Sequence, residues 1–186
     1  MKKLIMWNVV TLDGYFEGVK PWDLDFHQTV WGDELEAFTI EQLDTADTIV
    51  YGANTYHGMA DYWMHAKDDP KAEQLNTMPK VVCSTTIETP EWENTTIVRD
   101  AVGELQNMKE QGDGNMFVFG SGILSESLMK AGLFDEYRLC IAPVFLGNGR
   151  RLFNEGLPYQ KLQLREQRRL QNGGIILMYI PSSDGM

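Results

Sequence analysis

The chain has 186 residues, of which 43% are hydrophobic and 23% charged, a composition that fits a single globular domain and excludes collagen-like and disordered chains. Its 16 basic and 27 acidic side chains give a net charge of −11, so its surface as a whole repels a phosphate backbone and general nucleic-acid binding is excluded. Residues 137–186 are the exception, with 7 basic and 3 acidic side chains, so a small anion must bind through backbone donors or these few arginines.

The N-terminal segment predicts neither a membrane span nor a targeting signal. Its apolar run from Leu4 is about seven residues long, far short of the roughly 20 needed to cross a bilayer, and Thr11-Leu12-Asp13-Gly14 follows at once. We therefore expect a cytoplasmic protein with no membrane partner. Cys83 and Cys140 each stand alone in an apolar run and are expected to be reduced core thiols.

Short apolar runs alternate with segments of helical period up to Gly132. Lys3–Leu12 predicts the first strand, whose apolar residues do not alternate, as in a strand covered on both faces of a mostly parallel sheet. Four more strands are predicted at Thr48–Tyr51, Lys80–Ser84, Thr95–Arg99 and Met116–Phe119. Helical patterns occupy residues 31–38, 56–63, 101–108 and 124–131. The alternation favours an α/β sheet with right-handed crossovers.

The pattern changes after Gly132, where three predicted strands follow without a long helix between them: Glu136–Val144, Lys161–Leu170 and Gly174–Ile180. Gln171-Asn172-Gly173 predicts a tight hairpin between the last two, because Asn-Gly supplies the positive φ angles of such a turn. Apolar residues alternate in this hairpin, so one face is expected to be exposed. The sheet is thus predicted to be mostly parallel with antiparallel C-terminal strands, whose uncovered edge predicts a homodimer.

Three strand-to-helix turns have compositions suited to binding phosphate: Tyr51-Gly52-Ala53-Asn54-Thr55, Cys83-Ser84-Thr85-Thr86 and Phe119-Gly120-Ser121-Gly122-Ile123-Leu124. In an open α/β sheet such turns meet at the carboxyl edge, where helix N-termini present unpaired N–H groups to anions. Helix capping by Thr55 and Ser121 is the alternative for any single turn, and Ser125 stands where G-x-G-x-x-G requires glycine. Together the three turns predict a nucleotide site.

These turns, together with Thr11–Phe16, Gly132–Glu136 and Ala142–Gly147, make the chain resemble the dihydrofolate reductase superfamily over nearly its whole length. More narrowly, it is similar to stand-alone bacterial proteins related to the reductase domain of bifunctional riboflavin-biosynthesis (deaminase-reductase) enzymes. The resemblance implies a three-layer α/β/α fold in one domain, residues 1–186, with NADPH as hydride donor. It implies a heterocyclic substrate, either a pterin such as dihydrofolate or an aminated pyrimidine such as 5-amino-6-(5-phosphoribosylamino)uracil.

The resemblance also assigns residues to the cofactor. The adenosine half would contact Gly52, Asn54, Thr55, Ser84, Thr85 and Thr86. The pyrophosphate would contact Gly120, Ser121, Gly122, Ile123 and Leu124, and residues 12–18 would cover the nicotinamide. Relatives usually carry a basic residue after the glycine corresponding to Gly52, where it pairs with the 2′-phosphate, but this chain has Ala53. NADH is therefore an alternative donor unless Lys80, Arg99 or Thr86 compensates.

Hydride transfer to a C=N or C=O bond also needs a proton source. Asp25 is the predicted acid, because its apolar neighbours in Trp22-Asp23-Leu24-Asp25-Phe26 would raise its pKa, although a solvated or helix-capping role fits it equally well. Asp13 fits a role in shaping the Asp13-Gly14 turn better than a role in catalysis. Substrate contacts are predicted at Trp7, Asp13, Phe26 and Tyr56, with core packing as the alternative for the aromatic residues.

His57, Asp61 and His65 share a helix face, but neither histidine completes an H-E-x-x-H motif, so no metal is predicted. The predicted function is an NAD(P)H-dependent reduction of a small heterocycle. A non-catalytic dimer, or one that binds another nucleotide while keeping the fold, is the alternative that Ala53 and the unassigned acid leave open.

Overall fold

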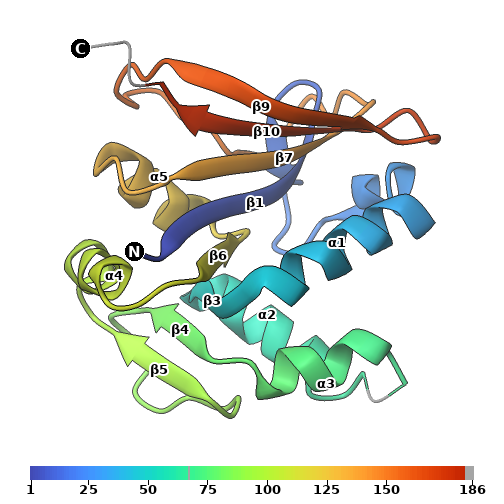
Figure 1. Ribbon diagram of the computed structural model, residues 1–186. Helices are drawn as coiled ribbons and strands as arrows, with labels where there is room; N and C mark the ends of the chain where they lie inside the picture. Colours follow the sequence, from blue (N-terminus) through green and yellow to red (C-terminus); the bar gives the residue numbers. More distant parts are fainter. Residues whose placement is uncertain (67, 183–186) are drawn as a thin grey trace.

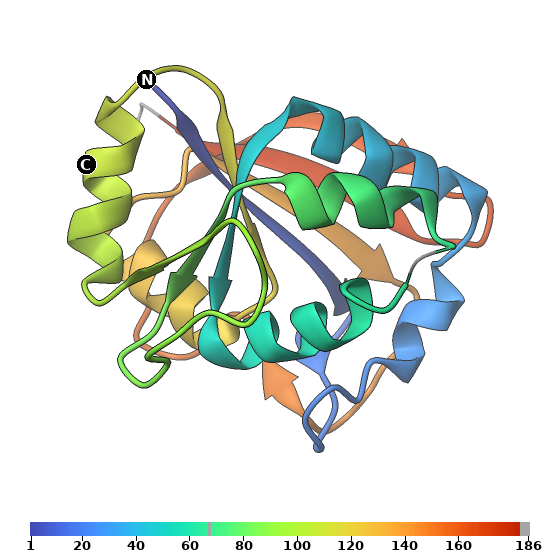
Figure 2. The same ribbon diagram turned by 90° about the horizontal axis from the view of Figure 1, so that it is seen from below.

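The computed structural model describes residues 1–66 and 68–182, in which helices cover both faces of an eight-stranded sheet (Figures 1 and 2). The strands run in the order β5 (Thr95–Val98), β4 (Lys80–Cys83), β3 (Ala46–Gly52), β6 (Asn115–Phe119), β1 (Lys3–Thr11), β7 (Glu136–Ala142), β10 (Ile175–Pro181) and β9 (Leu162–Arg169). The pairs from β5 to β7 are parallel, and β10 pairs antiparallel with both β7 and β9. The predicted three-layer α/β fold and its mixed sheet are confirmed.

Each face of the sheet has its own hydrophobic core. The 3-10 helix η1 (Asp25–Thr29) and helices α1 (Asp33–Thr45), α2 (Ala53–Trp63) and α3 (Pro70–Thr77) cover one face. Helices α4 (Ala101–Glu110) and α5 (Gly122–Lys130) cover the other. Strand β1 contributes Ile5 and Trp7 to the first core and Leu4 and Met6 to the second. Burial on both faces explains why its apolar residues do not alternate.

Several short elements differ from the prediction. Strand β2 (Tyr15–Glu17) pairs with β8 (Arg150–Arg151), a contact too short and too distant in sequence to leave a periodic pattern. Helix α3 was not predicted because it is mostly polar, although Asp69 before Pro70 is a common helix-start signal, and the Asp69 carboxylate accepts from the Lys71 N–H. The helix predicted from residue 31 begins only at Asp33, which leaves Trp31 outside it and 45% exposed.

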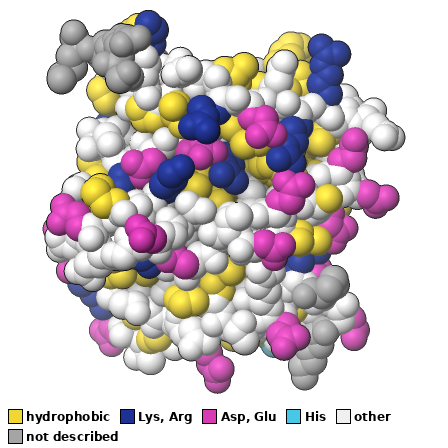
Figure 3. Space-filling view, in the orientation of Figure 1, with side chains coloured by type: hydrophobic (Ala, Val, Ile, Leu, Met, Phe, Trp, Pro, Cys, Tyr) yellow, Lys and Arg dark blue, Asp and Glu magenta, His cyan; other side chains and the backbone are white. Residues whose placement is uncertain are grey.

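The C-terminal hairpin forms as predicted. Gly173 adopts φ +95° in the turn, and the Leu170 N–H donates to the Gly174 carbonyl over 2.9 Å. Strand β9 is the edge of the sheet, and nearly all of its side chains are exposed, including Leu164 at 45%. On the face seen in Figure 3, Lys and Arg side chains gather over the strands β7, β9 and β10, in keeping with the basic composition of residues 137–186.

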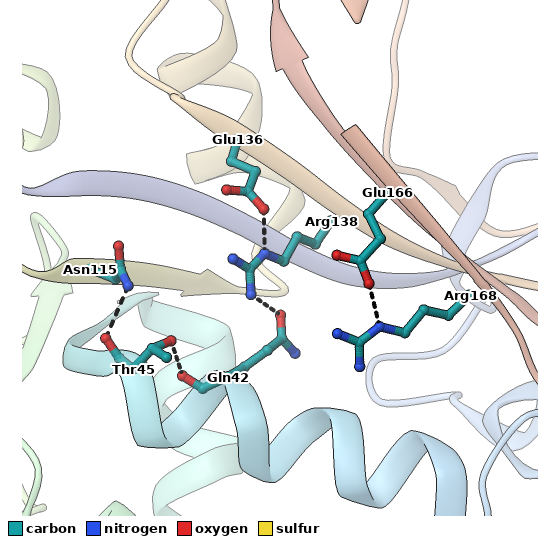
Figure 4. A network of polar contacts seen from close by, with 7 residues as sticks. All are labelled: Gln42, Thr45, Asn115, Glu136, Arg138, Glu166 and Arg168. Atoms are coloured by element: carbon teal, nitrogen blue, oxygen red, sulfur yellow. Dashed lines mark hydrogen bonds and ion pairs between the residues drawn. The ribbon is translucent and has the colours of Figure 1, made fainter. Parts of the chain in front are cut away.

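A polar network fixes α1 against the sheet (Figure 4). Arg138 of β7 donates to Glu136 over 2.7 Å and reaches the buried Gln42 side chain of α1 at 3.5 Å. Asn115 of β6 donates to the Thr45 carbonyl at the end of α1 over 3.1 Å. Arg168 of β9 forms ion pairs at 2.6 Å with Glu166 of the same strand and with Glu41 of α1. These contacts tie α1 to three strands. They therefore fix the position of the α1 side chains that face away from the sheet network and line the site described next.

Candidate functional site

A cavity of about 1550 Å³ lies at the carboxyl ends of the parallel strands, and all three predicted turns line it. Strands β3 and β4 end side by side at Gly52 and Cys83, and β6 ends beside β1 at Phe119 and Trp7. The eleven predicted cofactor residues all contribute to its wall: Gly52, Asn54, Thr55, Ser84, Thr85, Thr86, Gly120, Ser121, Gly122, Ile123 and Leu124. The sheet topology therefore gathers into one place residues that are far apart in sequence.

The two helices that begin at the first and third predicted turns, α2 and α5, have no anionic group of their own at the N-terminus. Helix α2 starts after Gly52 and α5 after Ser121, neither has a side-chain cap, and neither has an acidic residue in its first turn. Helices α3 and α4 are capped by Asp69 and Asp100, and α1 carries three acidic residues in its first turn. Ser121 is the N-cap residue of α5, but its side chain does not cap the helix. The first N–H groups and the dipoles of α2 and α5 are thus left to an external anion.

Close packing brings these two helix starts together (Figure 2). Gly52 leaves no room for a side chain, because a Cβ there would collide with the Ser121 hydroxyl. Gly120 adopts φ +61°, and a Cβ there would lie 3.4 Å from Thr55 of α2. A Cβ at Gly122 would lie 2.7 Å from the Phe16 ring, so β2 lies over the start of α5. At this place the cavity wall consists of backbone without side chains, and the N-terminal ends of α2 and α5 both face it.

Arg99 and Lys80, which were considered as replacements for a basic residue at position 53, have different environments. The Lys80 ammonium is fully buried and donates to the carbonyls of Leu75, Asn76 and Met78 at 2.7–3.1 Å, so it does not face the cavity. Arg99 is exposed and lines the cavity, and its Nη1 donates to the Ser84 carbonyl over 2.6 Å. Arg99 therefore carries the positive charge beside the second turn.

Of the predicted substrate contacts, Trp7 lines the cavity and the other three lie elsewhere. Phe26 and Tyr56 are core residues, and the Tyr56 hydroxyl accepts from the Trp92 N–H over 2.8 Å. The Asp13 carboxylate accepts from the N–H groups of Leu146 and Gly147 and from the Thr11 hydroxyl.

Partial burial opposes ionisation of Asp13, but these hydrogen bonds outweigh it and lower its pKa to about 2. These contacts fit the role in shaping the turn that the sequence favoured for Asp13. Asp25 is exposed and is not part of the cavity wall, so the geometry gives no support to its predicted role as the acid.

The structure brings other polar residues to the cavity that the sequence did not single out. Asn8 of β1 and His27 of η1 both line it. Burial lowers the pKa of His27 to about 4, so its imidazole is neutral at physiological pH. Glu36, Asp61, Asp69 and Lys71 form the part of the wall contributed by α1, the end of α2 and the start of α3. The sequence signal that could have identified Asn8 is its position as an isolated polar residue within an apolar strand.

The cysteines and histidines singled out in the sequence have different surroundings: Cys140 is a buried core thiol as expected, whereas Cys83 is only partly buried and lines the cavity. Within residues 1–66 and 68–182, no three His, Cys, Asp or Glu side chains are grouped closely enough to hold a metal ion. His57 contacts Glu91, and His65 contacts the Asp61 carbonyl, each at 2.7 Å. Both cysteines are unpaired, and burial raises the pKa of each thiol to about 12. No helix within the described ranges, 1–66 and 68–182, is long and apolar enough to cross a bilayer.

Comparison with known proteins gives one family and one fold. The family described as the RibD C-terminal domain matches residues 2–176. The uncharacterized protein YyaP of Bacillus subtilis is 27% identical over 183 residues, which are 96% of this chain and 94% of that protein.

Among solved structures, Acinetobacter baumannii RibD aligns with a TM-score of 0.71 and 16% identity, covering 98% of this chain and 59% of that chain. Dihydrofolate reductase from Enterococcus faecalis, complexed with NADP(H), aligns with a TM-score of 0.64 and 12% identity, covering 97% of each chain. At these identities the structural matches show the fold.

Proposed function

The chain belongs to the RibD C-terminal domain family, and we propose that it is a reductase that uses a nicotinamide cofactor, NADPH in preference to NADH, to reduce a small heterocycle of the pyrimidine or pterin type. The observation that carries this proposal is the pair of helix starts, α2 and α5, that meet at the cavity with neither a side-chain cap nor an acidic first turn. Two such helix ends suit the pyrophosphate of a dinucleotide.

Arg99 supports the preference for NADPH. It stands at the cavity edge beside Ser84, Thr85 and Thr86, in the turn assigned to the adenosine half. One of its N–H groups is used by the Ser84 carbonyl, and a guanidinium has five such donors, so others can contact a 2′-phosphate. Arg99 thereby supplies the positive charge that relatives usually carry at the position of Ala53.

A bound nicotinamide supplies the hydride, and the chain's own residues bind, orient and cover the reactants. Residues 12–18 close over the start of α5, because Asp13 is held by the Leu146 and Gly147 N–H groups and β2 is paired with β8. The Phe16 ring of this segment packs on Gly122. Such a cover keeps water away from the start of α5, where the pyrophosphate is proposed to bind.

Tryptophan fluorescence tests the proposal directly, since Trp7, Trp22, Trp31 and Trp63 all line the cavity. Titration with NADPH should quench this fluorescence and raise the melting temperature. The absence of both effects at millimolar NADPH and NADH refutes the proposal. Binding of NADPH without turnover of any pyrimidine or pterin supports the non-catalytic alternative instead.

A matched pair of variants at the start of α5 tests the anion site itself. Ser121 has φ +60°, a conformation that Asp and Asn tolerate better than most residues. Ser121→Asp places a carboxylate where the pyrophosphate should bind and should weaken NADPH binding at least ten times more than the isosteric Ser121→Asn. Equal weakening by the two variants would exclude a phosphate at this helix start.

A further inference from the structure

The cavity has a second end, contributed by α1, α3 and the last turn of α2, with the opposite electrostatic character. The charged side chains that the described residues of this end contribute to the wall are Glu36, Asp61, Asp69 and Lys71, with a net charge of −2. Asp61 lies eight residues beyond Ala53 in α2, so about 12 Å of helix separates this end from the cofactor turns. An anion that is attracted at one end of the cavity is therefore repelled at the other.

Lys71, the one cation that the described residues contribute to this end of the wall, is already neutralised. Its side chain is 7% exposed, and its Nζ contacts a Glu36 oxygen at 2.5 Å and an Asp69 oxygen at 3.0 Å. Burial lowers the pKa of Lys71, but the hydrogen bonds and charges of the two carboxylates outweigh this and raise it. The ammonium therefore stays charged while the Glu36–Lys71–Asp69 trio has a net charge of −1. Among the cavity-lining residues that the structure describes at this end, no free cation is left for a phosphate.

The other cations of the cavity wall lie away from this trio. Arg99 is bonded to Ser84 in the second cofactor turn. Arg150 pairs with Glu17 at 3.3 Å, and Arg151 donates to the Asp13 carbonyl at 3.1 Å, both in the β2–β8 ribbon that lies over α5. All three therefore serve the cofactor end or its cover.

Two polar nitrogens in the same cavity wall have no hydrogen-bond partner. Asn8 is only 5% exposed, and its Nδ2 is buried and unpaired. The buried Nε2 of His27 is also unpaired, and the ring packs edge-on against Phe26 with 4.7 Å between centroids. A buried polar group left unpaired costs about 1–3 kcal/mol, so His27, on the same face of the sheet as the trio, favours a ligand that supplies a partner. A neutral imidazole pairs with an uncharged ring nitrogen or oxygen.

We propose that the substrate of this reductase is an uncharged lactam ring without a phosphate group, which pairs with His27 Nε2 and whose tail lies against the Glu36–Lys71–Asp69 trio on the same face of the sheet. This specificity rests on the proposed function, because it assumes that the remaining space in the cavity holds the heterocycle to be reduced. It separates the chain from an enzyme that acts on a phosphoribosyl compound, since such a substrate would bring its phosphate to an end with net negative charge.

Two pairs of compounds that differ only by a phosphate test the specificity. They are 5-amino-6-(ribosylamino)uracil with its 5′-phosphate and 7,8-dihydroneopterin with its 3′-phosphate. Affinities are measured by calorimetry, with and without saturating NADPH, so that ring binding and cofactor binding are assessed separately. In at least one pair the unphosphorylated compound should bind ~10-fold more tightly or better. Equal or tighter binding of the phosphorylated compounds overturns the proposal, and so does the failure of all four to bind.

Variants then locate the cause. Glu36→Gln combined with Asp69→Asn removes both carboxylates from Lys71 and should reduce the preference against phosphate at least fivefold. The control, Glu104→Gln combined with Glu110→Gln on α4, makes the same change in net charge on the opposite face of the sheet and should leave the preference unchanged. An equal effect of both pairs of substitutions would show that only the overall charge matters and would overturn the role of the trio.

His27→Leu, which keeps a side chain of similar volume and removes the ring nitrogens, should weaken both members of a pair equally. Unchanged affinity for both would remove His27 from the ring site. NADPH quenching of each variant shows that the cofactor end is intact. Failure of NADPH to bind the unmodified protein refutes the proposed reductase, whereas a preference for phosphate with normal NADPH binding refutes only the specificity.

Discussion

Replacement of Arg99 by methionine should convert a protein that prefers NADPH into one that does not distinguish the two cofactors. Methionine keeps an unbranched apolar stem and removes the guanidinium. NADPH and NADH differ only by the 2′-phosphate, so the NADH affinity of each variant reports any general damage to the site. Arg99 is exposed, and the one contact it would lose within the protein is the hydrogen bond to the Ser84 carbonyl.

The expected loss of NADPH affinity follows from the charges of the proposed contact between Arg99 and the 2′-phosphate. A unit pair about 4 Å apart at an effective dielectric constant of about 20 is worth about 4 kcal/mol, which is an upper limit for an exposed arginine. Hydrogen bonds to charged groups contribute about 1.5–3 kcal/mol net. This range corresponds to a loss of roughly 10- to 150-fold in NADPH affinity, with less than about a threefold change for NADH.

Tryptophan quenching measures both affinities, and thermal melting verifies that each variant is folded. Arg165→Met removes an exposed arginine from β9 and serves as the matched control with both cofactors unaffected. Ala53→Arg should act in the opposite direction and increase the NADPH to NADH preference, because it adds a guanidinium at the start of α2. Equal losses for the two cofactors in Arg99→Met, or no loss, would show that the 2′-phosphate does not lie beside this residue.

Four further predictions concern stability, reactivity and assembly. Tyr51→Phe should raise the melting temperature by a few degrees, because the Tyr51 hydroxyl is fully buried without a partner; a lower melting temperature would reveal a hidden hydrogen bond. His27, with a folded pKa of about 4 against an ordinary 6.5, takes up its proton more readily in the unfolded chain, so stability should fall as pH drops from about 6.5 to 4. Urea unfolding of His27→Gln should show a smaller fall, and an unchanged pH profile would contradict this assignment. Cys83 lines the cavity with its pKa raised to about 12, so iodoacetamide should modify it slowly, and more slowly still with NADPH; mass spectrometry with buried Cys140 as internal reference detects both effects, and acceleration by NADPH would be inconsistent with the site. Leu164→Glu on the edge strand β9 should convert a homodimer into a monomer by light scattering, whereas a monomeric unmodified protein would rule out this interface.

The gathering of the three turns at one cavity could be predicted from the sequence because their determinants are local. Each turn joins the end of a buried strand to the start of a helix, and parallel strands necessarily end at the same edge of the sheet. Gly52, Ser84 and Gly120 could therefore be placed together without knowing any distance. The hairpin at Asn172-Gly173 was predictable for the same reason, since its geometry depends on two adjacent residues.

The substrate end could not be predicted because its determinants are not local. Asp25 and His27 are two residues apart on a 3-10 helix, so a small rotation decides which of them faces the cavity, and no apolar repeat fixes that rotation. The β2–β8 ribbon joins segments more than 130 residues apart through two paired positions. Tyr56 and Phe26 looked like ring-stacking residues, yet their aromatic surface is used by the core.

The net charge of −11 has a different meaning once its distribution is known. Acidic residues are absent from the first turns of α2 and α5, and they line the wall between α1 and α3. The cavity is therefore polarised, with helix dipoles and Arg99 at one end and a net charge of −2 at the other. On the proposed function, a dinucleotide in this cavity would be oriented with its phosphates toward the helix starts and its neutral nicotinamide toward the negative end. The same field would keep a second anion out of the proposed substrate position, so one charge distribution would account for both the orientation of the cofactor and the exclusion of phosphorylated rings.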